Sequence, residues 1–393
     1  MRFKTLREAE VRGRRVLLRE DLNVPMKAGA IADETRITAA LPTLRWLHEQ
    51  GAKTVILSHL GRPDGGPDPA YSLRPIAARL AELLATPVRF VEDCVGDAAV
   101  AASRSLPDGG FAVFENVRFH AEEEANDPGF SRELARSGDL YVNDAFGTAH
   151  RAHASTAGVA AMLPAYAGFL MEAELAALAR LVDAPARPFV CAIGGAKVVD
   201  KVGVFEHLVA KVDAFVIGGG MANTFLAAQG IEVGASLRDP DLTPAQRIIA
   251  MSVAQGVALH LPTDAVVADA FDADDTARTV ALDAVGAAMI LDIGPQTARA
   301  YAEVLRGAKT IVFNGPMGVY EKAPYREGTR VVGAAIAEAT RRGAFSVVGG
   351  GDAAAAAHLL GFADAMTHVS TGGGATLEFL EGKTLPGIAA LER

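Results

Sequence analysis

The sequence has few cysteines and no excess of positive charge. Its 393 residues include only Cys94 and Cys191, which excludes a disulfide scaffold and fits a reducing compartment. The 38 Lys and Arg are outnumbered by 47 Asp and Glu, giving a net charge of −9. No overall positive field would therefore attract nucleic acid or an anionic membrane. Any anion site must be a local cluster of basic residues.

Long apolar runs are also missing. The uncharged stretch 214–231 contains four glycines together with Asn223, Thr224 and Gln229. It is therefore too polar for a membrane span, which needs about 20 apolar residues. The N-terminus is charged from Arg2 onward and has no apolar signal region. These observations predict a soluble, cytoplasmic protein with neither a membrane nor a nucleic-acid partner.

Half of the residues are hydrophobic, and short apolar runs alternate with helix-like segments. The chain exceeds the roughly 250–300 residues that one core supports, so we expect two domains. Uninterrupted apolar runs are typical of strands buried on both faces of a parallel sheet. The runs are 16–18, 54–57, 111–114, 140–142, 189–193, 214–217, 265–268, 310–313 and 345–348. The helical segments include 37–50, 74–84, 200–211 and 297–305. The alternation predicts an α/β fold with parallel sheets.

One segment near the middle of the chain is predicted to connect the two domains. Residues 171–183 are rich in Glu, Ala and Leu, which favour helix, and Pro185 and Pro188 follow. We expect a helix and hinge here, joining two domains whose ligands must be brought together.

Basic and polar residues follow the apolar runs of the first half. In open α/β sheets, ligands bind at the carboxyl ends of strands. A single arginine there is as well explained by a surface salt bridge, but several together favour a site for a small compound with phosphate and carboxylate groups. The converging residues are Arg36, His59, Arg62, Arg118 and Arg151.

Glycines follow the runs of the second half instead, in the clusters 194–195, 218–220, 349–351 and 372–374. One such cluster can be only a tight turn. Several at strand ends favour a nucleotide site, because glycine lets backbone N–H groups approach phosphates. Lys197 and Lys201 are four residues apart, and we expect them to project from one helix face toward this site.

Two known nucleotide-binding motifs can be compared with these clusters. The P-loop pattern does not occur. Gly349, Gly351 and Ala354 match a loose dinucleotide fingerprint, which leaves a nicotinamide-dependent oxidoreductase as an alternative. Asp352 inside that loop would repel a bare pyrophosphate, but it suits Mg²⁺ lying between carboxylate and phosphates. Neither cysteine has metal-ligand spacing to the other or to a histidine, so we expect no metal site there.

Together, an arginine-lined anion site and a nucleotide site indicate phosphoryl transfer between the two ligands. An acceptor carboxylate is already ionised at pH 7 and needs no general base. A non-catalytic phosphometabolite or nucleotide binder is the alternative. The combination of Arg36, Lys197 and Asp352 speaks against it, since a binder needs no charges for a transferring group.

The motifs resemble those of the phosphoglycerate kinases, in the family's order and over essentially the whole chain. The matching stretches are 19–25, 33–37, 59–63, 115–119, 143–155, 194–201, 218–225, 314–321, 349–352 and 370–383. The resemblance implies reversible transfer of the acyl phosphate of 1,3-bisphosphoglycerate to Mg-ADP, giving 3-phosphoglycerate and ATP, by in-line transfer on domain closure.

The resemblance also implies a division of roles along the chain. It implies two Rossmann-like domains, with the phosphoglycerate domain at 1–170, the hinge at 171–188, the nucleotide domain at 189–370 and a C-terminal segment, 371–393, that returns to the first domain. It further implies a monomer, in which Arg36 and Lys197 steady the transferring group and Asp352 contacts Mg²⁺. The implied phosphoglycerate-binding residues are Asp21, Asn23, Arg36, His59, Arg62, Arg118 and Arg151. The implied nucleotide-binding residues are Gly195, Lys197, Lys201, Gly219, Asn314, Pro316, Glu321, Gly350, Gly351, Asp352 and Ala353.

Three residues depart from the family's pattern. Glu20 replaces a small apolar residue, and we expect it to pair with a nearby arginine. Phe313 replaces a common tryptophan within a strand. Ala353 replaces a Ser or Thr whose hydroxyl can donate to nucleotide phosphates, and losing one such bond costs about 0.5–1.5 kcal/mol. We therefore expect a somewhat raised nucleotide KM.

Overall fold

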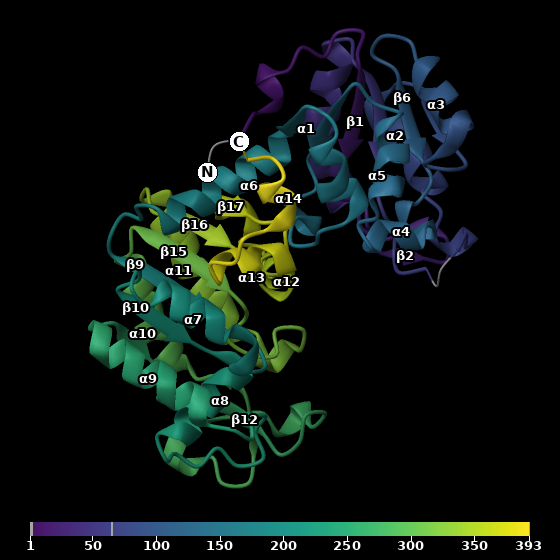
Figure 1. The fold of residues 1–393 in the computed structure, drawn as a ribbon. Coiled ribbons are helices and arrows are strands. Elements are labelled where there is room, and N and C mark those ends of the chain that lie inside the picture. Colours follow the sequence, from purple (N-terminus) through teal and green to yellow (C-terminus); the bar gives the residue numbers. More distant parts are fainter. Residues whose placement is uncertain (1–2, 64–65, 393) are drawn as a thin grey trace. The chain divides into compact units, whose positions relative to one another are not determined.

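The computed structural model describes residues 3–63 and 66–392, which form two compact units (Figure 1). Unit 1 runs to Ala176 and resumes at Thr384, while unit 2 comprises Ala177–Lys383. The division falls inside helix α6 (Phe169–Val182), which corresponds to the connector helix predicted at 171–183. Residues 371–383, assigned above to the returning C-terminal segment, belong to unit 2. The hinge role of residues 171–188 stays a prediction.

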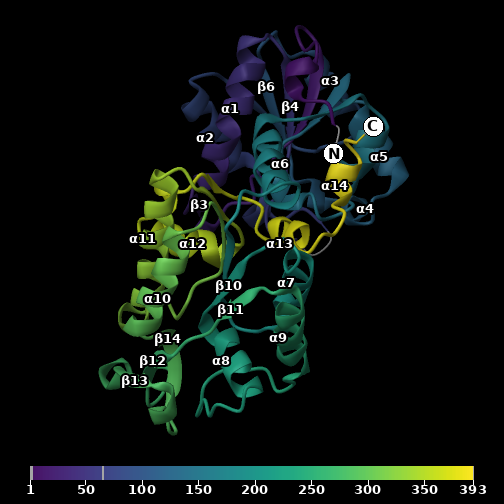
Figure 2. The same ribbon diagram turned by 90° about the vertical axis from the view of Figure 1, so that its left-hand side faces the viewer.

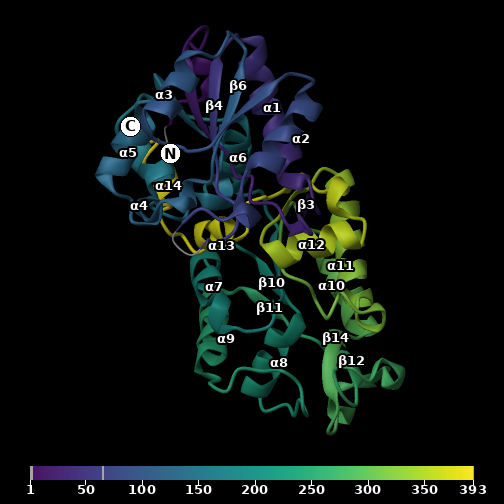
Figure 3. The ribbon, with the colours of Figure 1, turned by 90° about the vertical axis from the view of Figure 1, so that its right-hand side faces the viewer.

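Unit 1 contains a six-stranded sheet in the order β5-β6-β4-β1-β7-β8, and all of its pairs are parallel. Helices α1 (Thr35–Glu49) and α2 (Arg74–Leu84) cover one face, and α3 (Gly96–Arg104) and α5 (Pro128–Ala135) cover the other (Figure 3). The strands are β1 (Arg15–Arg19), β4 (Lys53–Leu57), β5 (Val88–Val91), β6 (Phe111–Phe114), β7 (Leu140–Asn143) and β8 (Ala165–Ala167).

The core of unit 1 explains why the apolar runs become central strands. Leu18, Ile56 and Val113 point from neighbouring strands into one cluster with Leu44 of α1 and Leu80 of α2, and all five are fully buried. Burying a side chain of this size stabilises the fold by about 1.5–3 kcal/mol. Residues between them in each strand are buried against the other face, so the runs show no polar alternation.

The two ends of the chain meet in unit 1, where Phe3 forms an antiparallel bridge with Glu392. The last helix, α14 (Pro386–Ala389), precedes this bridge, and the backbone N–H of Gly387 donates to the carbonyl of Ala149. The unit also has a two-residue hairpin of β2 (Met26–Lys27) and β3 (Ala30–Ile31), and a single helical turn, α4 (Ala121–Glu124).

Unit 2 repeats the architecture with the parallel order β11-β10-β9-β15-β16-β17. Helices α7 and α9 lie on one side of the sheet and α10 and α11 on the other (Figure 2). The strands are β9 (Phe189–Ile193), β10 (Ala214–Ile217), β11 (Ala258–His260), β15 (Thr310–Asn314), β16 (Phe345–Val348) and β17 (His368–Val369). The helices are α7 (Val202–Leu208), α8 (Gly219–Ala228), α9 (Thr243–Gln255), α10 (Pro295–Arg306), α11 (Glu327–Arg341), α12 (Gly351–Leu359) and α13 (Gly374–Leu380).

One predicted parallel strand is wrong. The run 265–268 lies in β12 (Asp264–Ala268), which pairs antiparallel with β13 (Arg278–Ala281) and β14 (Met289–Ile293) in a separate three-stranded sheet. Its apolar character has another cause: Ala265 and Val267 pack into one small core, and Ala268 packs into a second one. An apolar run reports burial on both faces, which strands of either direction can have.

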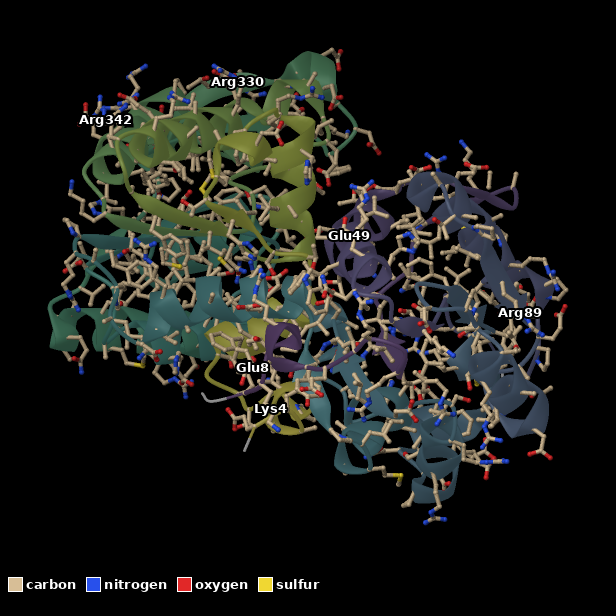
Figure 4. All side chains as sticks on the ribbon, turned by 90° about the horizontal axis from the view of Figure 1, so that it is seen from above. Lys4, Glu8, Glu49, Arg89, Arg330 and Arg342 are labelled. Carbon is tan, nitrogen blue, oxygen red and sulfur yellow. The ribbon has the colours of Figure 1, made fainter. Side chains whose placement is uncertain are left out.

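Many surface arginines have local partners. Arg330 and Arg342 lie on the outer surface of α11 and at its C-terminal end (Figure 4), where they pair with Glu327 and Glu338 of the same helix. Exposed pairs of this kind contribute about 0–1 kcal/mol each. Within the described residues, no helix combines the length and the hydropathy that a membrane span requires.

Candidate functional site

The carboxyl ends of the central strands of unit 1 meet at an open cavity of about 670 Å³. Arg62 follows β4, Arg118 follows β6 and Arg151 follows β7, so the sheet brings together three arginines that are far apart in sequence. The cavity is lined by Arg62, Pro63, Arg118, His120, Ala121, Glu124, Arg151 and His153. Three guanidinium groups at one cavity suit a small polyanion.

Arg36 begins α1 and is held in place by the loop that follows β1. Its Nη1 atom donates to Oδ1 of Asp21 and to the backbone carbonyl of Asn23, both at 3.0 Å. The side chain of Asn23 accepts from the backbone N–H of Gly61 at 2.8 Å, which ties this loop to the one after β4. Asp21 and Asn23 therefore position Arg36 and the neighbouring loop.

His59 follows β4 and is buried beside an arginine. Nη2 of Arg19 lies 3.2 Å from Nδ1 of His59. Since arginine can only donate, Nδ1 is the acceptor and the neutral ring carries its proton on Nε2. Burial lowers the pKa of His59 well below its usual value, and the charges of Arg19, Arg118, Arg151 and Arg36 lower it further. His59 is thus a neutral hydrogen-bond donor.

A network that no sequence motif indicates holds Arg19. This buried side chain donates from Nε to Oγ of Ser155 at 2.8 Å. Ser155 in turn donates to the buried carboxylate of Glu123 through its backbone N–H and its hydroxyl. The signal was an arginine ending an otherwise apolar strand, but its partner is 136 residues away along the chain.

The expected ion pair of Glu20 is not found. Arg19 donates to the backbone carbonyl of Glu20 and not to its carboxylate. Oε1 of Glu20 is buried and has no hydrogen-bond partner among the described residues. Burial raises the pKa of Glu20 well above its usual value, and the nearby carboxylate of Asp144 adds to this effect. The burial of Glu20 thus favours the protonated form of its carboxyl group, because an unpaired buried charge is costly.

Arg118 contributes positive charge that the protein compensates only in part. Its Nη1 donates to the carbonyl of Gly61 at 2.8 Å, and its Nε lies 3.0 Å from Oε1 of Glu124 without a hydrogen bond. Burial lowers the pKa of Arg118, and Arg151 and Arg19 are among its charged neighbours. Since arginine stays charged in proteins, an anion bound in this cavity would lower the repulsion between Arg118 and its arginine neighbours.

Unit 2 has a cavity of about 550 Å³ at the carboxyl ends of its sheet. Its wall includes Leu226, Leu237, Met289 and Leu291, an apolar surface suited to a flat base, while Asp352 lies at its rim. Five residues predicted to bind nucleotide line it: Gly195, Gly219, Pro316, Glu321 and Asp352.

The glycines of this site let three loops pack backbone to backbone. A Cβ atom on Gly194 would lie 1.9 Å from the carbonyl oxygen of Pro316, and one on Gly315 would lie 2.3 Å from the carbonyl oxygen of Gly194. Gly315 also has φ +118°, a conformation that residues with a side chain rarely adopt. The sequence predicts that these glycines allow close approach to phosphate. The structure adds a second reason, because a side chain at these positions would clash with the neighbouring loop.

Lys201 faces the same loops. Its Nζ atom donates to the carbonyls of Gly194 at 2.6 Å and Asn314 at 2.5 Å. Burial lowers the pKa of Lys201 to about 8, against the opposing effect of nearby acids such as Asp352. The prediction that Lys197 shares a helix face with Lys201 is wrong. Lys197 is exposed in the loop before a 3-10 turn, and α7 begins only at Val202.

Lys197 and Lys201 do not line the cavity, and neither do four other predicted nucleotide residues. Asn314 is buried and donates from Nδ2 to the carbonyl of Gly349 at 2.7 Å. Gly350, with φ +102°, and Gly351 form the start of α12, whose N-terminal N–H groups favour anions. Ala353 is buried in the hydrophobic core of the unit. A hydroxyl at position 353 would need to leave that core to reach a phosphate.

Asp352 fits a magnesium ligand. It lies exposed in the first turn of α12 and lines the cavity, so its carboxylate can reach a phosphate-bound cation. Mg²⁺ in phosphotransfer sites is held by one or two carboxylates together with substrate phosphates and water. One exposed carboxylate beside this cavity is sufficient for that arrangement.

Comparisons with known proteins bear on both units. Residues 6–383 match the family model described as phosphoglycerate kinase. The phosphoglycerate kinases of Roseiflexus castenholzii and Chloroflexus aurantiacus are each 54% identical to this chain, and each alignment covers all of this chain and 99% of the relative. The solved phosphoglycerate kinase of Coxiella burnetii is 42% identical with a TM-score of 0.91, covering 99% of both chains. That of Pyrococcus horikoshii is 35% identical with a TM-score of 0.85, covering 99% of this chain and 98% of the other.

Proposed function

This chain belongs to the phosphoglycerate kinase family, and we propose that unit 1 binds the phosphoglycerate while unit 2 binds the nucleotide. The protein is a glycolytic kinase that reversibly transfers the acyl phosphate of 1,3-bisphosphoglycerate to ADP, giving 3-phosphoglycerate and ATP. The observation that carries the division of roles is the contrast between the two cavities. One is lined by three arginines, and the other by glycines, apolar side chains and the carboxylates of Asp292, Glu321 and Asp352.

In unit 1, the arginines of the cavity hold the phosphate and carboxylate groups of the acid. Arg62, Arg118 and Arg151 supply the charge, and the neutral ring of His59 donates from Nε2. Asp21 holds the guanidinium of Arg36 in position, and Asn23 holds the loop at Gly61. Guanidinium groups suit this task because they can donate two parallel hydrogen bonds to one anionic group.

In unit 2, the nucleotide base lies against the apolar wall and the phosphates lie over the glycine loops. Glu321, on the cavity wall, binds the ribose hydroxyls. Gly195, Gly219 and Pro316 allow close approach, and Lys201 turns from its two carbonyl partners toward the phosphates. Asn314 supports the loop at Gly349. Gly350, Gly351 and Ala353 form the N-terminal end of α12, whose backbone N–H groups favour phosphate.

The transfer step needs little chemistry from the protein beyond charge. The carboxylate of 3-phosphoglycerate is ionised at neutral pH and attacks the γ-phosphorus of ATP without a base, as the bond to the β-phosphate oxygen breaks. Arg36 and Lys197 stabilise the charge on the transferring phosphoryl group, and they act mainly in the transition state. Mg²⁺, held by Asp352, would neutralise phosphate charge when bound.

The family assignment decides between the alternatives left open by the sequence. The fingerprint-like residues Gly349, Gly351 and Ala354 form the start of α12 in a kinase, so the oxidoreductase alternative is not supported. A non-catalytic binder is likewise not favoured. A monomeric state and a cytoplasmic location belong to this proposal. The location is supported by the glycolytic reaction and by the two free, buried cysteines.

Two variants separate the two binding sites. We expect Arg62→Ala to raise the Kd for 3-phosphoglycerate by about 10- to 100-fold, because a charge-assisted hydrogen bond contributes about 1.5–3 kcal/mol. Its Kd for ADP should stay unchanged. Glu321→Ala should raise the Kd for ADP and leave the Kd for 3-phosphoglycerate unchanged. Calorimetric titration of each variant with each ligand measures both constants. A loss of ADP binding in Arg62→Ala with retained 3-phosphoglycerate binding would contradict the assignment.

Lys201 should make nucleotide binding take up protons. At pH 8 about half of the Lys201 side chains are neutral, given the pKa of about 8. Phosphate binding favours the charged form, so ADP should bind with uptake of roughly 0.5 proton at pH 8 and roughly 0.1 at pH 7. Affinity should accordingly fall as the pH rises above 8.

Calorimetry without Mg²⁺, in two buffers of different ionisation enthalpy, measures this uptake. Lys201→Arg is the matched control, because it keeps the charge and cannot titrate in this range. Equal proton uptake by the wild type and by Lys201→Arg would show that another group is responsible.

A further inference from the structure

Three metal-ligating side chains of unit 1 lie together outside the roles proposed above. Asp93 and Cys94 follow β5, and His120 lies between β6 and α4. One carboxylate oxygen of Asp93, Sγ of Cys94 and a ring nitrogen of His120 all lie within 4.8 Å of one another. The sequence spacing predicts no metal site here, because 25 residues separate Cys94 from His120. The packing of the loop after β5 against the loop after β6 creates the cluster.

The thiol of Cys94 is buried and faces negative charge. The residue is only 1% exposed. Burial raises the pKa of this thiol well above its usual value, and the carboxylates of Asp93, Glu123 and Glu115 raise it further. The surroundings thus disfavour a bare thiolate but favour a cation beside the sulfur.

Asp93 and His120 form the open side of the cluster. Nε2 of His120 lies 2.8 Å from Oδ1 of Asp93, and the ring packs against Phe130 with 5.0 Å between ring centres. Oδ1 of Asp93 also accepts from the backbone N–H of Cys94 at 2.7 Å, which fixes the carboxylate near the sulfur. The side chain of Asp93 is 53% exposed and that of His120 is 29% exposed, so a hydrated ion can enter.

We propose that Asp93, Cys94 and His120 form a binding site for a thiophilic divalent cation of the Zn²⁺ type, with water as the fourth ligand. Bonds of about 2.0–2.3 Å in a tetrahedron place ligand atoms about 3.3–3.8 Å apart. The Asp93–His120 pair, now 2.8 Å apart, must therefore open slightly. On binding, three waters leave the hydrated cation as its bonds to sulfur, carboxylate oxygen and imidazole nitrogen form. The thiol proton passes to water, and the Asp93–His120 hydrogen bond breaks as the imidazole proton moves to the other ring nitrogen through solvent. A sulfur and an imidazole ligand select against Mg²⁺.

The cation also affects the phosphoglycerate site, a consequence that rests on the proposed function. His120 lines the arginine cavity of unit 1 together with Arg118 and Glu124. Drawing the ring toward Cys94 moves part of that wall, so an occupied metal site weakens binding of 3-phosphoglycerate. By linkage, 3-phosphoglycerate weakens binding of the cation by the same factor.

Titration of the whole protein with Co²⁺, without nucleotide or Mg²⁺, tests the site directly. We expect one equivalent to bind with a thiolate-to-cobalt absorption band in the near ultraviolet, and Zn²⁺ to displace it. Cys94→Ala should lose the band, and His120→Gln should weaken binding by about tenfold or more. The matched controls are Cys191→Ala at the other buried thiol and His358→Gln at an exposed histidine of unit 2. Both should bind as the wild type does.

The outcomes are distinct. A band that persists in Cys94→Ala, unchanged binding by His120→Gln, or no cobalt bound at millimolar concentration would each overturn the proposal. His120 is partly exposed, so His120→Gln keeps the test valid if Cys94→Ala fails to fold. The spectrum does not depend on substrate. A cobalt band without any effect on 3-phosphoglycerate binding would therefore overturn only the coupling, while failure of the phosphoglycerate assignment would leave the band intact.

Discussion

Replacing Arg36 with alanine should lower kcat by about 100- to 1,000-fold while changing either KM by less than about tenfold, because a preorganised charge aimed at a transition state contributes on this scale. Two acceptors hold Arg36 at 3.0 Å, so its guanidinium is positioned before substrate arrives. The measurement is steady-state kinetics with each substrate varied at saturation of the other.

Arg45 provides the matched control for this variant. It lies on the same helix, α1, and is exposed, so Arg45→Ala removes one positive charge from the unit without touching the cavity. We expect its kcat to be that of the wild type. If Arg36→Ala instead raises the KM for 3-phosphoglycerate and leaves kcat unchanged, Arg36 is an ordinary binding residue.

Gly315→Ala should impair both the stability of unit 2 and nucleotide binding. The new methyl group would lie 2.3 Å from the carbonyl oxygen of Gly194 and 2.9 Å from Nζ of Lys201. The two loops must separate, which displaces Lys201 from its partners. We expect the ADP Kd to rise by about 100-fold, equivalent to about 2.7 kcal/mol. Calorimetry gives the Kd, and urea denaturation gives the loss of stability.

Gly343→Ala separates this clash from backbone strain. Gly343 also has a positive φ, +94°, but a Cβ atom there would meet nothing within 4 Å. Gly343→Ala should lower the free energy of unfolding by only about 1–2 kcal/mol, the cost of a left-handed conformation for a residue with a side chain. The Kd for ADP should stay unchanged. An ADP Kd in Gly315→Ala equal to that in Gly343→Ala would show that the loop contact does not shape the site.

The sequence predicted the central strands well because their apolar runs have one physical cause, burial on both faces. It could not give strand direction, and for that reason residues 265–268 were assigned to the wrong kind of sheet. It also could not locate where α7 begins. Lys197 and Lys201 have helical spacing, yet the glycine-rich loop extends past Lys197 and the helix starts at Val202.

The site was predictable where each residue follows its own strand, as Arg62, Arg118 and Arg151 do. It was not predictable where function depends on pairs that are distant along the chain. The contact between Arg19 and Ser155 spans 136 residues, and the cluster at Cys94 needs the loops after two adjacent strands to meet. Such contacts arise from packing, which periodicity and spacing do not encode.

The most direct test of the account is the back reaction. The protein is mixed with 3-phosphoglycerate and ATP, with and without Mg²⁺, and coupled to glyceraldehyde-3-phosphate dehydrogenase so that NADH loss reports turnover. We predict turnover that requires Mg²⁺ and is nearly abolished in Arg36→Ala. A folded protein that binds both ligands but shows no turnover would contradict the account and would favour a non-catalytic binder.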